Sequence, residues 1–272
     1  MNAREIAEIA DELVAAYTSA SILAPITAAR PAFDVADAYA VLAEIETRRC
    51  REGWQPAGRK IGFTNRTIWP RYGVYQPMWA RIWTHTVHHA TEGRASLAIA
   101  RFVQPRLEPE VVFKLRRPIP LTDDARAVLR CVEWVAAGFE IVQSHFVDWK
   151  FKAPDCTAAF GLHGALIVGT PLPVTDANCD FIAAQLPKFV ATLARDNVVI
   201  DRGIGANVLD SPALALVHLA RVLIGQPQAP VLAANEIVTT GTLTDAWPIA
   251  RGETWTSDYG ALGLEGLELR IE

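Results

Sequence analysis

The segment LEPEVVF carries two glutamates, Glu108 and Glu110, separated by one residue and flanked by apolar side chains. Alternate residues of a β-strand project from the same face, so a strand here places the two carboxylates side by side. Carboxylates that close repel each other unless a cation or a proton neutralises them. The apolar neighbours argue against a solvated charged edge, and the spacing therefore indicates a site in which paired carboxylates do chemistry.

Glu140 is a third acid of the same kind, because it stands alone in the apolar segment AAGFEIV. A buried carboxylate is unfavourable unless it is paired or coordinated. Three carboxylates form an all-oxygen site that suits Mg²⁺ or Mn²⁺ and leaves positions for water or substrate. The residues alone leave an alternative open, because acids also occur in structural networks. In that alternative the paired glutamates bind Arg106 or Lys114, and Glu140 accepts hydrogen bonds from backbone amides.

Three further residues are candidate acid–base groups. Lys60 lies between two glycines in GRKIG, and a lysine that is desolvated beside a cation can lose its proton and act as a base. The alternative for Lys60 is an ordinary solvated strand lysine. His163 lies in FGLHG, where it can approach a ligand closely or complete a turn. Asp155 is the third candidate. The histidines of THTVHHA read as strand and turn, and we interpret them as surface residues rather than metal ligands.

The composition narrows the class of protein. The 272 residues suffice for one large domain, 51% of them are hydrophobic, and the net charge of −4 is spread along the chain, which excludes a disordered chain or a basic nucleic-acid surface. The four cysteines are far apart and form no CxxC, so we expect reduced thiols. The charged N-terminal segment is not a signal sequence, and no apolar run suggests a membrane span. We therefore expect a cytoplasmic protein.

The N-terminal part, residues 1–58, is predicted to form a helical cap. Apolar residues from Ile6 to Tyr17 recur at intervals of three and four, as on one face of a helix. A second helix is expected to begin after Asp34, a suitable N-cap, and to end at REG.

The remainder, residues 59–272, is predicted to be a β-rich catalytic domain that forms one structural unit with the cap. Short β-rich segments follow one another, and two helices are expected, DDARAVLRCVEWVAA and SPALALVHLARVL, the latter with Ser211 as N-cap and Pro212 in its first turn. Strands that do not alternate regularly with helices argue against a doubly wound sheet and favour an α+β fold.

Several motifs, spread over nearly the whole length of the chain, follow one another in an order that resembles one protein family. They are DAYAVLAEI, GRKIGFTN, GVYQP, QPRLEPEVVF, GFEIVQSHFVDWKF, RGIGANVLDSPALALVHLARVL and TTGTLT. The chain resembles the 2-oxopent-4-enoate hydratase and 4-oxalocrotonate decarboxylase branch of the fumarylacetoacetate hydrolase superfamily. The resemblance implies that superfamily's mixed β-roll, preceded by helices.

The resemblance also implies a set of functional residues and partners. Glu108, Glu110 and Glu140 would bind Mg²⁺ or Mn²⁺, and Lys60 would line the pocket. The expected substrate-binding residues are Arg106, Phe160, Leu162 and Thr242. Such proteins are usually homo-oligomers, with pentamer-based decamers common among the hydratases, and they can associate with paralogous enzymes of the same pathway. They act late in the meta-cleavage degradation of aromatic compounds.

The chain departs from the family pattern at one segment. Where hydratases resemble DTVADNASSG, this chain has DCTAAFGLHG, so Ala159, Phe160 and Leu162 replace polar residues. Either His163 takes over as proton donor or the substrate differs. We predict hydration of a 2-hydroxy-2,4-dienoate to a 4-hydroxy-2-oxo acid. A decarboxylase of the 4-oxalocrotonate type, an acylpyruvate C–C hydrolase and a non-catalytic partner of a family member remain the alternatives.

Overall fold

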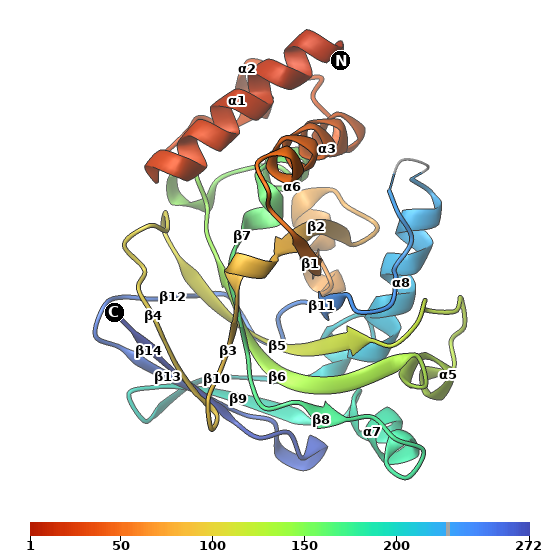
Figure 1. Cartoon of the computed structure of the whole chain (residues 1–272). Helices are drawn as coiled ribbons and strands as arrows, with labels where there is room; N and C mark the ends of the chain where they lie inside the picture. The colour runs from red at the N-terminus through yellow and green to blue at the C-terminus, as the bar shows by residue number, and fades with distance from the viewer. Residues whose placement is uncertain (227–228) are drawn as a thin grey trace.

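The computed structural model describes residues 1–226 and 229–272 (Figure 1). Two helices at the N-terminus, α1 (Ala3–Ser19) and α3 (Val35–Arg51), lie at one end of the molecule, joined through the short α2 (Ile26–Ala29). Both expected helices are thus confirmed, and each begins with a capping box, on Asn2 and on Asp34.

The N-terminal helices are fixed to the rest of the chain by a small apolar cluster. Residues of α1 and α3 share this cluster with Phe146 and Phe160 and with Ala158 of α6 (Ala153–Ala158). The first strand, β1 (Pro56–Gly62), begins just before the expected boundary at residue 59. The division into a cap and a catalytic domain remains a prediction.

The described strands form two sheets. The larger, of nine strands, runs in the order β2-β1-β11-β5-β6-β7-β3, with β12 paired to β5 and β8 to β6. Its members besides β1 are β2 (Met78–Trp83), β3 (Val87–His89), β5 (Arg106–Leu115), β6 (Val132–Val142), β7 (His163–Val168), β8 (Leu172–Pro173), β11 (Ile237–Thr239) and β12 (Trp247–Pro248). The long strands β5 and β6 curve together across the molecule (Figure 1).

The smaller sheet has five strands in the order β10-β9-β13-β14-β4. They are β4 (Arg94–Leu97), β9 (Val190–Arg195), β10 (Val198–Ile204), β13 (Thr254–Asp258) and β14 (Leu267–Ile271). The largest apolar cluster joins the two sheets to α8 (Pro212–Ile224), through residues such as Phe113, Leu193, Leu216 and Leu269. Three shorter helices complete the fold, α4 (Trp69–Tyr72), α5 (Ala125–Leu129) and α7 (Cys179–Gln185).

One predicted helix is wrong in most of its length. In DDARAVLRCVEWVAA the helix α5 ends at Leu129, and Val132 begins β6. The segment is rich in β-branched and aromatic residues, and pairing with β5 along ten positions outweighs its helical periodicity. As a consequence, Glu140 lies within a central strand and not between a helix and a strand.

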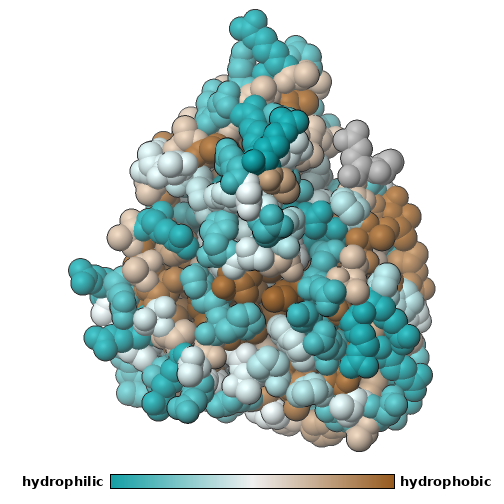
Figure 2. Space-filling model, viewed as in Figure 1, coloured by the Kyte–Doolittle hydropathy of each residue, from teal (hydrophilic) through white to brown (hydrophobic). Residues whose placement is uncertain are grey.

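The helix α8 is confirmed, but the expectation about apolar runs needs correction. Residues 205–224 are long and apolar enough to cross a membrane by length and composition, yet 61% of that window is buried inside the protein. The regular part, Pro212–Ile224, is a core helix. Figure 2 shows that the face in view is largely hydrophilic, with hydrophobic residues gathered near the upper end of α8. All four cysteines are free thiols, as expected.

Candidate metal centre

The three glutamates meet because β5 and β6 are antiparallel neighbours. Glu108 is directly opposite Glu140 across the strand pair, and Glu110 is opposite Gly138. Carboxylate oxygens from the three residues all lie within 4.8 Å of one another. Glu110 and Glu140 are completely buried, whereas Glu108 is partly exposed. The structure therefore brings the predicted cluster together with one side open to solvent.

Backbone contacts hold Glu110 in place. The amide of Gly241 donates to Glu110 Oε2 at 2.7 Å, and the Tyr259 hydroxyl donates to the Glu110 carbonyl oxygen at 2.8 Å. Gly241 adopts a φ of +99°, and a Cβ at this position would lie 2.0 Å from Thr64 Oγ1. Only glycine fits there, so the tight turn after β11 is part of the site.

Lys60 reaches the cluster from β1. Its Nζ lies 3.2 Å from Glu140 Oε2, and the side chain is 4% exposed. Gly161 makes room for it, because a Cβ there would lie 3.2 Å from Lys60 Cδ and 2.7 Å from the Ala80 Cβ. The lysine is therefore a buried member of the site and not a solvated strand residue.

His163 contacts Glu140 from the other side. Its Nδ1 lies 2.8 Å from Glu140 Oε1, and its Nε2 lies 2.9 Å from the Thr86 hydroxyl. The ring is 3% exposed, so both nitrogens are engaged within the protein. This geometry argues against the expected role of His163 as a proton donor to substrate. It supports a role in orienting Glu140, as residues behind metal ligands commonly do.

The buried charges shift one another's pKa values. Burial raises the pKa of Glu108 to about 7, and it also raises the pKa of Glu110, in both cases reinforced by the charge of Glu140. Burial acts in the same direction on Glu140, but the Lys60 ammonium and His163 outweigh it and lower the pKa of Glu140. Burial alone would lower the pKa of Lys60, but the three glutamates raise it. Lys60 and Glu140 therefore form an ion pair, to which two further carboxylates are added.

The cluster fits a divalent cation on two grounds. Three ionised glutamates and one ammonium leave a formal charge of −2 in a buried volume, which matches one divalent ion. Among the described residues, Glu110 Oε1 is buried without a hydrogen-bond donor, and Glu140 Oε2 has only the Lys60 ammonium beside it. Buried polar atoms are rarely left without a partner, and hard oxygen donors of this kind suit Mg²⁺ or Mn²⁺.

Asp155 has a different environment from the one expected. Its carboxylate accepts hydrogen bonds from the Thr27 amide and hydroxyl and from the Lys152 amide, each at 2.8 Å. These contacts cap α6 and attach α2 to it. All the donors belong to the protein, so the geometry argues against a catalytic role and supports a structural one.

Of the four expected substrate-binding residues, Arg106 and Thr242 lie on or next to the segments that carry the glutamate cluster. Arg106 lies on the same face of β5 as Glu108 and Glu110 and is partly exposed. Its guanidinium lies 4.2 Å from the centre of the Trp149 ring, and its charge acts on Glu108. Thr242 follows Gly241, but its hydroxyl donates to the Thr244 carbonyl.

Phe160 is directed away from the cluster. Its ring lies 4.9 Å from that of Tyr17 and 4.3 Å from the Arg49 guanidinium, within the N-terminal apolar cluster. Leu162 is partly exposed, and its carbonyl accepts from the Gln143 amide. The expected contact of Phe160 with substrate is therefore not supported.

The sequence did not reveal three residues that act on the cluster but lie far from its glutamates along the chain. Thr86, Gly241 and Tyr259 contribute a hydroxyl, an amide and a second hydroxyl. The only available signal was the TTGTLT motif, which contains Gly241.

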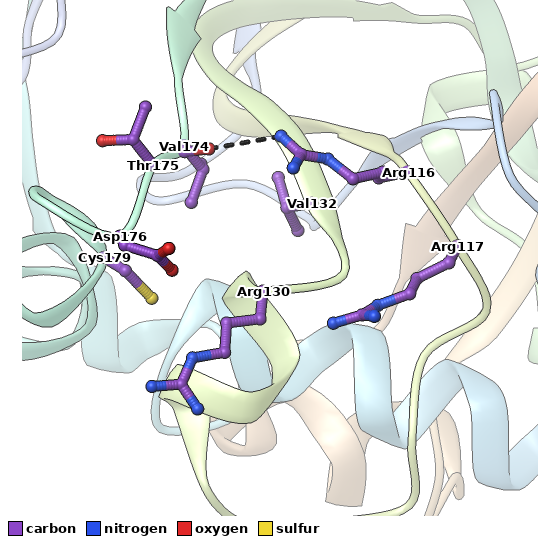
Figure 3. Close-up of a pocket in the computed structure, with 8 residues that line it drawn as sticks. All are labelled: Arg116, Arg117, Arg130, Val132, Val174, Thr175, Asp176 and Cys179. Carbon is purple, nitrogen blue, oxygen red and sulfur yellow. Dashed lines mark hydrogen bonds between the residues drawn. The ribbon is translucent and has the colours of Figure 1, made fainter.

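A surface cleft of about 420 Å³ lies far from the glutamates along the strands. It is lined by Arg116, Arg117 and Arg130 at the opposite ends of β5 and β6 (Figure 3). A sizeable cleft alone therefore does not locate the site, and the buried acid cluster is the better guide.

Comparisons with known proteins agree with this geometry. No family model matches the chain. The chain is 31% identical over 254 residues to 2-hydroxyhexa-2,4-dienoate hydratase of Comamonas testosteroni, covering 92% of each protein. It is 27% identical to 2-keto-4-pentenoate hydratase of Paraburkholderia xenovorans over 97% of the chain and 94% of that protein. It is 28% identical to 4-oxalocrotonate decarboxylase of a Pseudomonas species, over 95% and 96% of the two chains.

Solved structures support the same fold. The 4-oxalocrotonate decarboxylase of Pseudomonas putida G7, complexed with magnesium and adipate, matches with a TM-score of 0.89 at 21% identity over 100% of this chain and 99% of that one. The fumarylpyruvate hydrolase of Pseudomonas aeruginosa, complexed with Mn²⁺ and pyruvate, matches with a TM-score of 0.58 at 15% identity over 78% of this chain and 88% of that one.

The predicted α+β fold is confirmed as that of fumarylacetoacetate-hydrolase-like enzymes. Within that class, the chain belongs to the 2-keto-4-pentenoate hydratase and 4-oxalocrotonate decarboxylase family, and the resemblance inferred from its motifs is confirmed.

Proposed function

We propose that this protein is a metal-dependent hydro-lyase that hydrates a 2-hydroxy-2,4-dienoate to a 4-hydroxy-2-oxo acid in the meta-cleavage degradation of aromatic compounds. The observation that carries the proposal is the buried cluster of Glu108, Glu110 and Glu140, with Lys60 in ion-pair contact, in a relative of dienoate hydratases.

The three glutamates would hold Mg²⁺ or Mn²⁺. The donor set and the buried Glu110 Oε1, which has no hydrogen-bond donor among the described residues, support this assignment. When bound, the cation would supply the positive charge that stabilises negative charge developing on the C2 oxygen of a 2-oxo acid.

The chain's own residues would position the substrate and move protons. Arg106 shares a face of β5 with Glu108 and is partly exposed, so its guanidinium can attract a substrate carboxylate. Lys60 Nζ is buried beside Glu140 and keeps its proton, because the glutamates raise its pKa. This ammonium is suited to donate a hydrogen bond to an oxyanion, and it is the candidate proton donor.

The reaction needs two proton transfers and one water. The 2-hydroxyl group of the dienoate loses its proton while C5 gains one, which gives a 2-oxo-3-enoate. Water then adds, with its hydroxyl on C4 and its proton on C3. Stabilised charge at the C2 oxygen favours both steps.

Decarboxylation of a 4-oxalocrotonate-type acid is the second candidate. The relevant observation is the loss of polar side chains at Ala159 and Phe160, the latter turned toward Tyr17. Loss of CO₂ from such an acid needs the same stabilised enolate but no bound water. An acylpyruvate C–C hydrolase and a non-catalytic partner rank lower.

A substrate panel tests the proposal. Purified protein is assayed with Mn²⁺ or with chelator on 2-hydroxypenta-2,4-dienoate, 2-hydroxyhexa-2,4-dienoate, 4-oxalocrotonate and an acylpyruvate. We expect loss of the conjugated ultraviolet absorbance of a dienoate, only with metal and without CO₂ release. Release of CO₂ from 4-oxalocrotonate instead would move the assignment to decarboxylase, and formation of two acids would move it to hydrolase. No turnover, with tight binding to a family member, would favour the non-catalytic partner.

The assembly and location are also proposals. We propose that the protein is a homo-oligomer, with a pentamer or decamer as the expected size. We also propose that it associates with a paralogous enzyme of the same pathway and that it is located in the cytoplasm. The hydrophobic residues exposed near α8, among them Ile224, are compatible with a subunit contact. Light scattering after size-exclusion chromatography tests the oligomer, and fractionation of cells tests the location.

A further inference from the structure

A second cavity, of about 280 Å³, lies beside the N-terminal helices. It is formed where α1 and α3 meet the segment between β4 and β5, and its lining includes Tyr17, Arg49, Trp54, Arg101 and Phe102. None of the three glutamates lines it. The cavity is therefore separate from the metal centre.

Arg49 is the unusual residue of this cavity. Its side chain is 4% exposed, and its guanidinium carbon lies 4.6 Å, 4.1 Å and 4.3 Å from the ring centres of Tyr17, Trp54 and Phe160. Among the described residues it has no hydrogen bond or ion pair to a protein acceptor, although Glu52 lines the same cavity and its charge acts to raise the pKa of Arg49. By contrast, the neighbouring Arg48 binds Glu44 and Asp11.

The N–H donors of Arg49 are free to bind a ligand, because none of its nitrogens is among the buried atoms without a partner in the described part of the chain. Aromatic faces attract the cation, but they do not satisfy its N–H donors, of which arginine has five. Burial also lowers the pKa of Arg49 to about 10, which reflects the cost of holding this charge away from water. Arg49 lines the cavity, so an anion there can accept from its N–H groups.

The walls define what the rest of the ligand must be. Trp54 and Phe102 are aromatic and Val14 is aliphatic, whereas Thr18, Glu52 and Gln143 supply polar groups. Arg101 is a second cation at the rim, 4.9 Å from the Phe102 ring. A guanidinium binds the two oxygens of a carboxylate through parallel N–H bonds. We propose that this cavity is a binding site for a small organic carboxylate with a flat, unsaturated or aromatic body, held by Arg49 through its carboxylate.

Binding is tested on the metal-free protein, so that a carboxylate cannot bind a cation at the glutamates. With chelator present, benzoate is titrated while heat and tryptophan fluorescence are measured, because Trp54 lines the cavity. Benzamide, which has the same shape without charge, and inorganic phosphate, which has no apolar body, are the comparison ligands. We expect saturable benzoate binding and binding of both comparison ligands weaker by about tenfold or more.

The variants are Arg49→Met, Arg101→Met and the control Arg51→Met. Arg51 is exposed on the last turn of the same helix and does not line the cavity, so R51M removes the same charge without touching the site. R49M should lose benzoate affinity by about tenfold or more, R101M by less, and R51M not at all.

Three results would overturn the proposal: no saturable benzoate binding, equal binding of benzamide, or unchanged affinity in R49M. Equal or stronger binding of phosphate would also overturn it, since the apolar walls would then contribute nothing. If R49M does not fold, the benzoate-to-benzamide preference and R101M decide, and unchanged affinity in R101M would reject the site.

Discussion

Replacing Lys60 by methionine tests the electrostatic description of the metal centre. Lys60 Nζ and Glu140 Oε2 are 3.2 Å apart and buried. At that separation the attraction is about 5 kcal/mol for an effective dielectric constant near 20. The loss is smaller in practice, because the glutamates take up protons when the ammonium is removed. We therefore expect K60M, in chelator at about pH 8, to lose about 3 kcal/mol of unfolding free energy.

The pH dependence makes this prediction specific. At about pH 5.5 more of the cluster is protonated in both proteins, so the difference between K60M and wild type should shrink to about half or less. Urea denaturation at the two pH values, followed by tryptophan fluorescence, measures both free energies. Lys114→Met is the matched control, because Lys114 lies on β5, is partly exposed and forms no ion pair with any residue that the structure describes. If K60M has the same unfolding free energy as wild type, or loses the same amount at both pH values, the reasoning is refuted.

Three further predictions follow, two on the metal centre and one on the structural contacts of Asp155. Because burial raises the pKa of Glu108 to about 7, the metal-free protein should lose unfolding free energy as pH rises from about 5 to 8, and Mn²⁺ affinity by titration calorimetry should rise over the same interval. His163→Ala should weaken Mn²⁺ binding by about 10-fold to 100-fold through loss of the Glu140 contact, with His163→Asn less affected; identical Mn²⁺ affinity in both variants and wild type would exclude a positioning role. Asp155→Asn should lower the unfolding free energy by about 1–3 kcal/mol, because two donors of Thr27 and Lys152 lose an acceptor, while Mn²⁺ affinity stays unchanged; a variant as stable as wild type but inactive would restore Asp155 as a catalytic candidate.

The metal cluster was predictable from sequence because its signals are local. The spacing of Glu108 and Glu110 reflects the two-residue period of a strand. Glu140 was recognisable as a lone acid among apolar residues, even though its segment was expected to follow a helix. The strand register then places it opposite Glu108.

The functions of the other candidates depended on contacts between distant parts of the chain. Asp155 is bound by Thr27, 128 residues away, and His163 by Thr86, 77 residues away. No pattern within one segment reports such contacts. Similarly, Phe160 was expected in the pocket, but the ring packs on Tyr17 of α1.

The error in β6 has a physical reason as well. The segment after Leu129 has apolar residues at helical intervals, but it also contains Val132, Trp134 and Val135, which favour strands. Pairing with β5 on one side and with β7 on the other decides between the two states. That pairing is a tertiary effect, which the local sequence does not determine.

Metal binding by the glutamate cluster is tested most directly with Glu110→Gln. Glutamine keeps the size of Glu110 and can still accept from the Gly241 amide, but it removes one carboxylate charge from the proposed ligand set. In chelator, E110Q should melt at the same temperature as wild type or higher, because the mutual repulsion of the glutamates is reduced. With Mn²⁺ at about 100 times its dissociation constant, the wild type should gain about 2.7 kcal/mol of stability and E110Q far less. Equal gains in the two proteins would contradict the account, since Glu110 would then not be a metal ligand.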